Sequence, residues 1–111
     1  MELALSDIQI QIQSSAKKFA EAELAPVAAM LDNGRGREVY LANLRKLAEL
    51  GFMGLNVDAE YGGTEAGVVA FSVAMTEIAK SCAATAVAMS VTNLVSEVIQ
   101  SIGTEEQKLR Y

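Results

Sequence analysis

The feature that most constrains this chain is a long, uncharged and largely apolar stretch between Lys80 and Glu97. The stretch is shorter than the ~18 apolar residues that a membrane-spanning helix needs, and it contains serine, threonine and asparagine. It therefore predicts a buried helix of a soluble protein. We expect this helix over residues 84–102, and its apolar side chains, which surround nearly the whole circumference, predict that it is buried on all sides.

Helix-end signals predict two helices in the first third of the chain. Ser6 and Gln9 form a capping box, in which each side chain reaches the backbone of the other, at the start of a helix that continues to about residue 25. Pro26 should break this helix, because proline has no N–H and its ring clashes with the preceding turn. We expect Pro26 in the first turn of a short second helix.

A third helix is the clearest in the sequence. The preceding motif "DNGRG", residues 32–36, should end the short second helix with Gly34 in the left-handed conformation. The third helix then covers residues 37–50, with Gly51 just past its end. The following "MGLNV" is expected to run extended into a glycine-rich loop.

The remaining segments also predict helices, and none predicts a strand. A stripe of apolar residues at helical spacing predicts a helix over residues 67–82: Val68, Phe71, Met75, Ile78 and Cys82. A second capping box, Thr104 with Gln107, opens a last helix that reaches Tyr111. We therefore expect an all-α fold, a small bundle of about five helices in one domain over residues 1–111. The short final helix also predicts that the sequence is a segment of a longer chain.

Composition excludes several classes of function. The net charge is −5, and the nine lysines and arginines are scattered, which argues against nucleic-acid binding. The absence of histidine removes the commonest general base and most zinc and triad chemistry. The single cysteine, Cys82, predicts a small buried side chain and suits a reducing cytoplasm. No basic segment precedes the first apolar residues, so no signal peptide is predicted.

The loop "EYGGTEAG", residues 60–67, raises the question of a phosphate site. A dinucleotide fingerprint needs G-x-G-x-x-G between a strand and a helix, and a P-loop ends in Gly-Lys-Ser/Thr; this loop has neither pattern. Glu65 would also repel a phosphate. We interpret the loop as a turn in which Gly62 and Gly63 supply positive φ angles and Gly67 permits close packing at the next helix start.

Other charged and sulfur-containing side chains have ordinary structural interpretations. Glu77 is expected to form a solvated ion pair with Lys80, three residues further along a helix, in preference to acting as a general base. Met75 and Met89 are expected in the core, although flexible thioethers also line ligand cavities.

Three polar residues in the apolar helix over residues 84–102 are of particular interest. Thr92 and Ser96 can each bond a carbonyl of the preceding helical turn. Asn93 has no such local partner, and an unpaired buried amide costs about 1–3 kcal/mol. Two interpretations of Asn93 stay open: a structural hydrogen-bonding role and the lining of a cavity.

Several motifs together resemble the N-terminal α-helical domain of the acyl-CoA dehydrogenases. They are "LAELGF", "EYGG", "EIAKSC", "TAVAMS" and "GTEEQK", and the resemblance covers essentially the whole chain. The stretch "CAATAVAMSV" is most similar to the short-chain or butyryl-CoA type. One departure is Val57, where the family often has proline.

The resemblance implies a longer enzyme of three domains that binds FAD and oxidises an acyl-CoA thioester. It implies that a glutamate of the C-terminal domain removes the α proton, that a hydride passes to the flavin, and that an electron-transfer flavoprotein accepts the electrons. No catalytic or FAD-binding residue is assigned in this sequence. The resemblance places the helix over residues 84–102 at the acyl-chain cavity, which makes Met89, Asn93 and Ser96 the candidate lining residues. It also implies a homo-oligomer that does not insert into membranes.

Two alternatives stay open at this point. One is a stand-alone helical binding or adaptor module of the same fold, which should end in a capped helix and a polar tail. The other keeps the fold and changes the reaction, as in an acyl-CoA oxidase. We also expect the isolated domain to self-associate, because its apolar helix needs covering surfaces.

Overall fold

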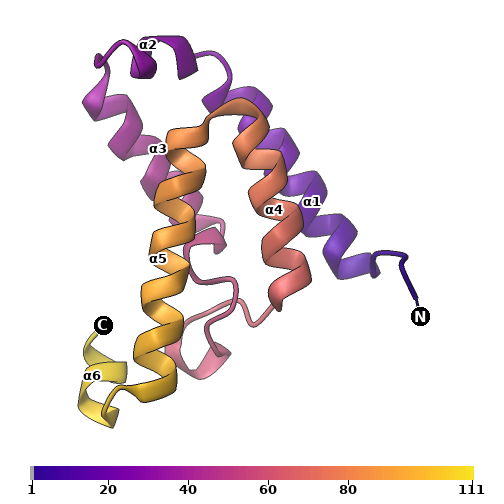
Figure 1. Cartoon of the computed structure of the whole chain (residues 1–111), viewed down its shortest axis with the longest axis vertical. Coiled ribbons are helices and arrows are strands. Elements are labelled where there is room, and N and C mark those ends of the chain that lie inside the picture. Colours follow the sequence, from indigo (N-terminus) through magenta and orange to yellow (C-terminus); the bar gives the residue numbers. More distant parts are fainter. Residues whose placement is uncertain (1) are drawn as a thin grey trace.

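The core forms where three long helices, α1 (Asp7–Phe19), α4 (Val68–Ser81) and α5 (Ala83–Ile102), lie side by side (Figure 1). The computed structural model describes residues 2–111, which contain helices and no strand. The remaining elements are a π-helical turn (Ala20–Leu24), α2 (Ala28–Asp32), α3 (Arg37–Glu49), two 3-10 turns (Phe52–Gly54 and Ala59–Tyr61) and α6 (Glu105–Arg110). The all-α prediction is confirmed, with six α-helices.

Alanines allow the close contact between α1 and α4. Ala16 of α1, Ala20 of the turn that follows it, and Ala70 and Ala74 of α4 are all almost completely buried, and α1 packs along α4. Small side chains let helix axes approach, since the interaxial distance depends on the residues at the contact. The apolar stripe predicted for α4 is therefore partly wrong: Ile78 and Cys82 are buried, but Val68 is exposed because the alanine face packs on α1.

Pro26 ends the first helix, as predicted, but it does not lie in the first turn of the next one. The helix widens into a π-helical turn, in which the Ala25 N–H donates to the Ala20 carbonyl at 2.9 Å. Pro26 then occupies a tight turn, and α2 begins only at Ala28 with Val27 as its N-cap residue. The missing N–H of proline interrupts the helical bonding pattern, and a separate turn is needed before the pattern resumes.

The segment after α3 differs from its predicted extended form. Gly51 has a φ of 84°, which confirms it as the left-handed residue after the helix end. The chain then folds into the 3-10 turn Phe52–Gly54, with Phe52 in the core. Burial of Phe52 holds the segment close to α3 and α5, so it cannot run straight.

Two glycines of the loop, Gly63 and Gly67, exchange their predicted roles. Gly62 has a φ of 85°, as expected, whereas Gly63 has no positive φ. A Cβ at Gly63 would lie 2.0 Å from the Val57 carbonyl oxygen, so this position needs glycine for space. Gly67, predicted to permit close packing, has open space around it and a φ of 88°. The left-handed Glu65, at a φ of 54°, was not predicted.

The helix α5 is covered on one side only, so its predicted burial on all sides is wrong for the described chain. Thr85, Ala86, Met89 and Asn93 are buried, whereas six larger apolar side chains on the other side are exposed. The domain measures 40 × 37 × 19 Å, so it is about two helices thick and cannot enclose α5. None of the helices in residues 2–111 combines the length and apolarity that crossing a membrane requires.

Replacing Gly63 by alanine should destabilise the fold by more than about 3 kcal/mol, since the new methyl group would overlap backbone atoms that cannot move freely. The matched change Gly62→Ala meets only open space and a strained φ, so it should cost about 1–2 kcal/mol. Urea unfolding of both variants gives the comparison. Equal losses would contradict the steric role of Gly63.

Candidate functional site

The centre of the candidate site is the side-chain amide of Asn93, which is almost completely buried. Its oxygen accepts a hydrogen bond from the Leu55 N–H at 2.8 Å. Its nitrogen donates to the Phe52 carbonyl and to the Met89 carbonyl, each at 2.9 Å. Met89 lies four residues back on α5, so the prediction that Asn93 lacks a partner in the preceding helical turn is wrong. One side chain of α5 thus satisfies two backbone groups of the 3-10 turn, which supports the structural interpretation of Asn93.

Two further polar side chains on the same side of α5 extend this attachment. Glu97, four residues after Asn93, accepts a hydrogen bond from the Asn56 amide nitrogen. Gln100, three residues further on, accepts from the Asp58 N–H at 2.7 Å and donates to the Asp58 carboxylate at 3.2 Å. Sequence reasoning missed Glu97 and Gln100, although polar residues at helical spacing from Asn93 on an apolar helix were the available signal.

The backbone N–H groups of the glycine loop are already occupied. Those of six consecutive residues, 61–66, all donate to carbonyls of residues 54–59, at distances of 2.7–3.1 Å. A phosphate cradle needs N–H groups that point outward and are free. The loop is therefore a self-bonded turn, which confirms the turn interpretation.

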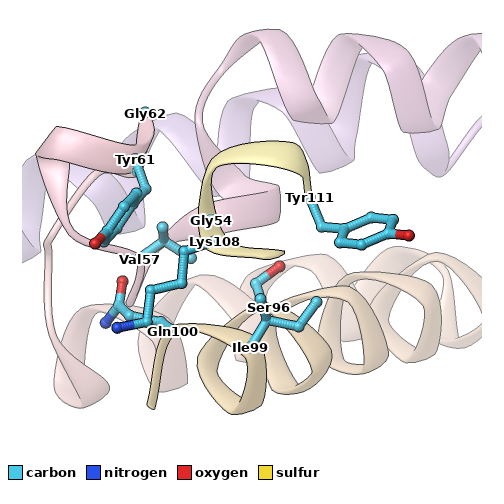
Figure 2. Close-up of a pocket in the computed structure, with 10 residues that line it drawn as sticks. Gly54, Val57, Tyr61, Gly62, Ser96, Ile99, Gln100, Lys108 and Tyr111 are labelled. Atoms are coloured by element: carbon cyan, nitrogen blue, oxygen red, sulfur yellow. The ribbon is translucent and has the colours of Figure 1, made fainter. Parts of the chain in front are cut away.

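A pocket of about 160 Å³ lies where this loop meets α5 and α6 (Figure 2). Ser96, Ile99 and Gln100 line it from α5, and the loop adds Tyr61 and glycine backbone. The α6 side contributes Lys108 and Tyr111. Because the hydrogen bonds of Asn93, Glu97 and Gln100 fix the loop against α5, they also fix the shape of this pocket.

The carboxylate of Glu105, at the edge of the pocket, bonds two of the side chains that line it. Glu105 accepts from the Lys108 ammonium at 3.2 Å and from the Tyr61 hydroxyl at 3.4 Å. The hydrogen bond that the Lys108 ammonium donates to Glu105 raises the pKa of Lys108 above its usual value. Desolvation, followed by the negative charge of Glu105, raises the pKa of Tyr61. At neutral pH this edge therefore carries a neutral phenol and a paired ammonium.

The structure separates the three residues that the sequence suggested as cavity lining. Ser96 borders the pocket, and its hydroxyl donates to the Thr92 carbonyl at 2.9 Å, as the sequence predicted. Thr92 bonds the Ala88 carbonyl in the same way. Met89 and Asn93 lie fully in the core, so their side chains contact protein atoms and not open space.

Glu77 and Lys80 form the predicted ion pair, but the prediction that both side chains are solvated is wrong. The two groups are 2.9 Å apart, but Glu77 is buried while Lys80 is exposed. Gln13 of α1 also donates to the Glu77 carboxylate, at 3.5 Å. The packing of α1 over this side of α4 explains the burial, which helical periodicity alone did not indicate.

The fold and pocket define a helical domain that presents one open side, and comparisons assign it to a family. The model of the acyl-CoA dehydrogenase N-terminal domain matches residues 6–111. The chain therefore belongs to the acyl-CoA dehydrogenase family, as the resemblance indicated.

Individual relatives agree with this assignment. The short-chain-specific acyl-CoA dehydrogenase of Clostridium acetobutylicum is 34% identical over 100% of this chain and 29% of its own length. The acryloyl-CoA reductase (NADH) of Anaerotignum propionicum is 35% identical over 100% of this chain and 28% of its own. The structure of butyryl-CoA dehydrogenase from Megasphaera elsdenii superposes with a TM-score of 0.88 at 30% identity, over 100% of this chain and 30% of that one. The chain thus spans less than a third of the length of each.

Substituting Asn93 by leucine should lower the free energy of unfolding by about 2–6 kcal/mol. Leucine has a similar size but leaves the buried Leu55 N–H and Phe52 carbonyl without partners, at about 1–3 kcal/mol each. Urea denaturation measures the loss. The control Thr92→Val removes only a bond within α5 and should change stability by less than about 0.5 kcal/mol. A small effect of Asn93→Leu would show that this amide does not hold the loop.

The Glu105→Gln substitution should lower the pKa of Tyr61, because it removes the negative charge that disfavours the phenolate. Phenolate absorbance in a Tyr40→Phe/Tyr111→Phe background reports Tyr61 alone. Since the folded-state pKa values of Tyr61 and Lys108 are both raised, their contribution is complete below pH about 10 and is lost as pH rises through the folded values. Glu106→Gln, which changes a carboxylate outside this contact, should leave the titration unchanged; an equal shift would contradict the assignment.

Proposed function

We propose that this chain is the N-terminal helical domain of an FAD-dependent enzyme that α,β-dehydrogenates short-chain acyl-CoA thioesters. The observation that carries the proposal is the match of the family model over residues 6–111. The similarity to a short-chain-specific dehydrogenase and to butyryl-CoA dehydrogenase supports the short substrate.

Within that enzyme, the domain forms one wall of the acyl-chain cavity, with Ser96 at its surface. The pocket beside Ser96 is about 160 Å³, and a cavity of ~150 Å³ is enough to hold benzene. A short acyl chain therefore fits this volume. Met89 and Asn93 support the wall from inside the core: Met89 by packing and Asn93 by holding the 3-10 turn in place.

The described residues do not fit the binding of FAD by themselves. The glycine loop offers no free N–H group over residues 61–66. We therefore assign the flavin to the parts of the longer enzyme outside this segment. By the same family resemblance we propose an electron-transfer flavoprotein as the electron acceptor and a homo-oligomeric enzyme. We propose a cytoplasmic location for a bacterial enzyme and the mitochondrial matrix for a eukaryotic one.

A second candidate function is the reverse reaction, because the acryloyl-CoA reductase (NADH) of Anaerotignum propionicum has similar identity and coverage. The longer polypeptide that contains this chain should be purified and assayed in both directions. We expect flavin absorbance and the oxidation of butyryl-CoA with an artificial electron acceptor. Reduction of acryloyl-CoA by NADH without butyryl-CoA oxidation would favour the second candidate, and failure of both would refute the proposal.

The 111-residue chain alone should fold as a helical domain but retain no flavin after purification. The physical reason is the lack of free phosphate-binding groups in the loop. Circular dichroism and absorbance near the flavin maximum provide the test. Stoichiometric bound flavin would show that the chain has an FAD site of its own.

In the longer enzyme, Ser96→Leu should shift the preference toward shorter acyl chains. The larger side chain removes substrate volume, and each methylene in a pocket is worth about 1–3 kcal/mol. The measurement is kcat/KM for a series of acyl-CoA lengths. Ser101→Leu, an exposed position on the same helix outside this pocket, is the matched control. If the preference for acyl-chain length is unchanged in Ser96→Leu, Ser96 does not line the acyl-chain cavity.

A further inference from the structure

Residues 25–46, which comprise α2 and most of α3, contribute almost nothing to the core of the domain. Leu24 before this segment and Leu47 after it are both fully buried. Of residues 25–46, all of which the structure describes, only Asn43 is buried, and its side chain is polar. We call residues 25–46 the flap. The flap is therefore held to the domain mainly by half-buried apolar groups and by polar bonds.

Two of these polar bonds reach Glu23, which lies just before the flap in the π-helical turn. The side-chain amide of Asn43 donates to the Glu23 carbonyl at 3.1 Å. The Lys46 ammonium donates to the Glu23 carboxylate at 2.7 Å. Both side chains of the ion pair are partly exposed, so this pair contributes little in water. The stronger attachment is the bond from the buried Asn43.

The turn at Pro26 explains why the Glu23 carbonyl needs a side-chain donor. In a continuing α-helix this carbonyl would accept from the N–H of Val27, four residues further on. Because the chain turns at Pro26, the Val27 N–H donates to the Leu24 carbonyl instead, at 3.1 Å. The amide of Asn43 takes the place of the lost donor, so the bond is made only while the flap lies against the first helix.

The flap covers the turn between α4 and α5 without packing closely on it. In Figure 1, α2 and this turn lie at the same end of the molecule. Ala28 and Leu31 of the flap are half-buried at the edge of the core. A cavity of about 460 Å³ lies between α2 and residues 82–84. The Tyr40 hydroxyl adds one long hydrogen bond, 3.4 Å, to the Ala84 carbonyl.

We infer that the flap opens as a unit while α1, α4 and α5 stay folded, and that Asn43 is its latch. Segments with few buried apolar contacts are the ones that open at low free energy in a native protein. Opening removes Ala28 and Leu31 from the neighbourhood of Cys82, which is 7% exposed when the flap is closed. The flap thus controls whether solutes reach Cys82.

Native-state hydrogen exchange of the 111-residue chain tests whether the flap opens by itself. The amides of α2 and of the first half of α3 should exchange through an opening that depends little on urea, because that opening exposes little surface. Its equilibrium constant should be at least about tenfold larger than that for the amides of α4 and α5. Equal constants and equal urea dependence would mean that the flap unfolds only with the whole domain, which overturns the inference.

The latch is tested with Asn43→Ala, which leaves the Glu23 carbonyl without its donor. The opening constant of the flap should rise about 5–100-fold. Global unfolding, measured at α4 and α5, should rise by the same factor, because the unfolded chain also lacks this bond. The matched variant Ile12→Ala trims a partly buried side chain of α1 outside the flap. It should raise global unfolding and leave the opening of the flap unchanged; an equal rise in both overturns the assignment of a separate unit.

Labelling of Cys82 with the thiol reagent DTNB gives an independent readout. Without urea, Asn43→Ala should speed the labelling by the factor that exchange gives for the flap, and Ile12→Ala should not change it. Labelling that follows global unfolding in both variants would show that the flap does not control access to Cys82. If Asn43→Ala does not fold by circular dichroism, Lys46→Met removes the exposed ion pair instead and should raise both flap readouts about 1.5–5-fold. No change in either readout overturns the role of Glu23 as the attachment point.

Discussion

The attachment of the 3-10 turn to α5 depends on one buried amide. Asn93 satisfies the N–H of Leu55 and the carbonyl of Phe52, two groups that lie in the core and cannot reach water. A 3-10 turn satisfies few of its own backbone groups, so a turn that enters a core must find partners elsewhere. Once the turn is fixed, the N–H groups of the glycine loop bond the carbonyls of residues 54–59. The loop then lies against α5 and lines the pocket beside Ser96. The geometry of the candidate site thus follows from a hydrogen-bonding requirement of the backbone.

The two sides of α5 are specified by different physics. On the inner side, Asn93, Glu97 and Gln100 make directional hydrogen bonds, which fix both the register and the orientation of the packed segment. On the outer side, aliphatic groups interact through area and shape, which tolerate small displacements. The inner side is therefore suited to hold one precise geometry, whereas the outer side does not by itself fix the position of a neighbouring surface.

Much of the fold could be predicted from the sequence because its signals are local. The capping boxes at Ser6 and Thr104 and the left-handed Gly34 and Gly51 depend on neighbouring residues only, and all are present. The family motifs added the fold class and the family. Features that depend on distant segments could not be predicted in the same way: the compact course of residues 52–58, the burial of Glu77 under α1, and the steric need for Gly63 beside Val57. The site shows the same division, because the back-bonded hydroxyls of Thr92 and Ser96 were predicted while the partners of Asn93 were not.

The error in predicting α5 has a specific physical origin. An apolar helix was expected to be buried all round, since exposure of apolar area to water is unfavourable. That expectation assumes that the chain is large enough to cover the helix. A domain 19 Å thick has about two helical layers, and α5 lies at its margin with one side uncovered. The apolar sequence of α5 therefore reflects every contact that the helix makes. The residues of this chain supply the contacts on one side of it only. Because the uncovered side carries six exposed aliphatic side chains, burial of that side would remove further apolar area from water.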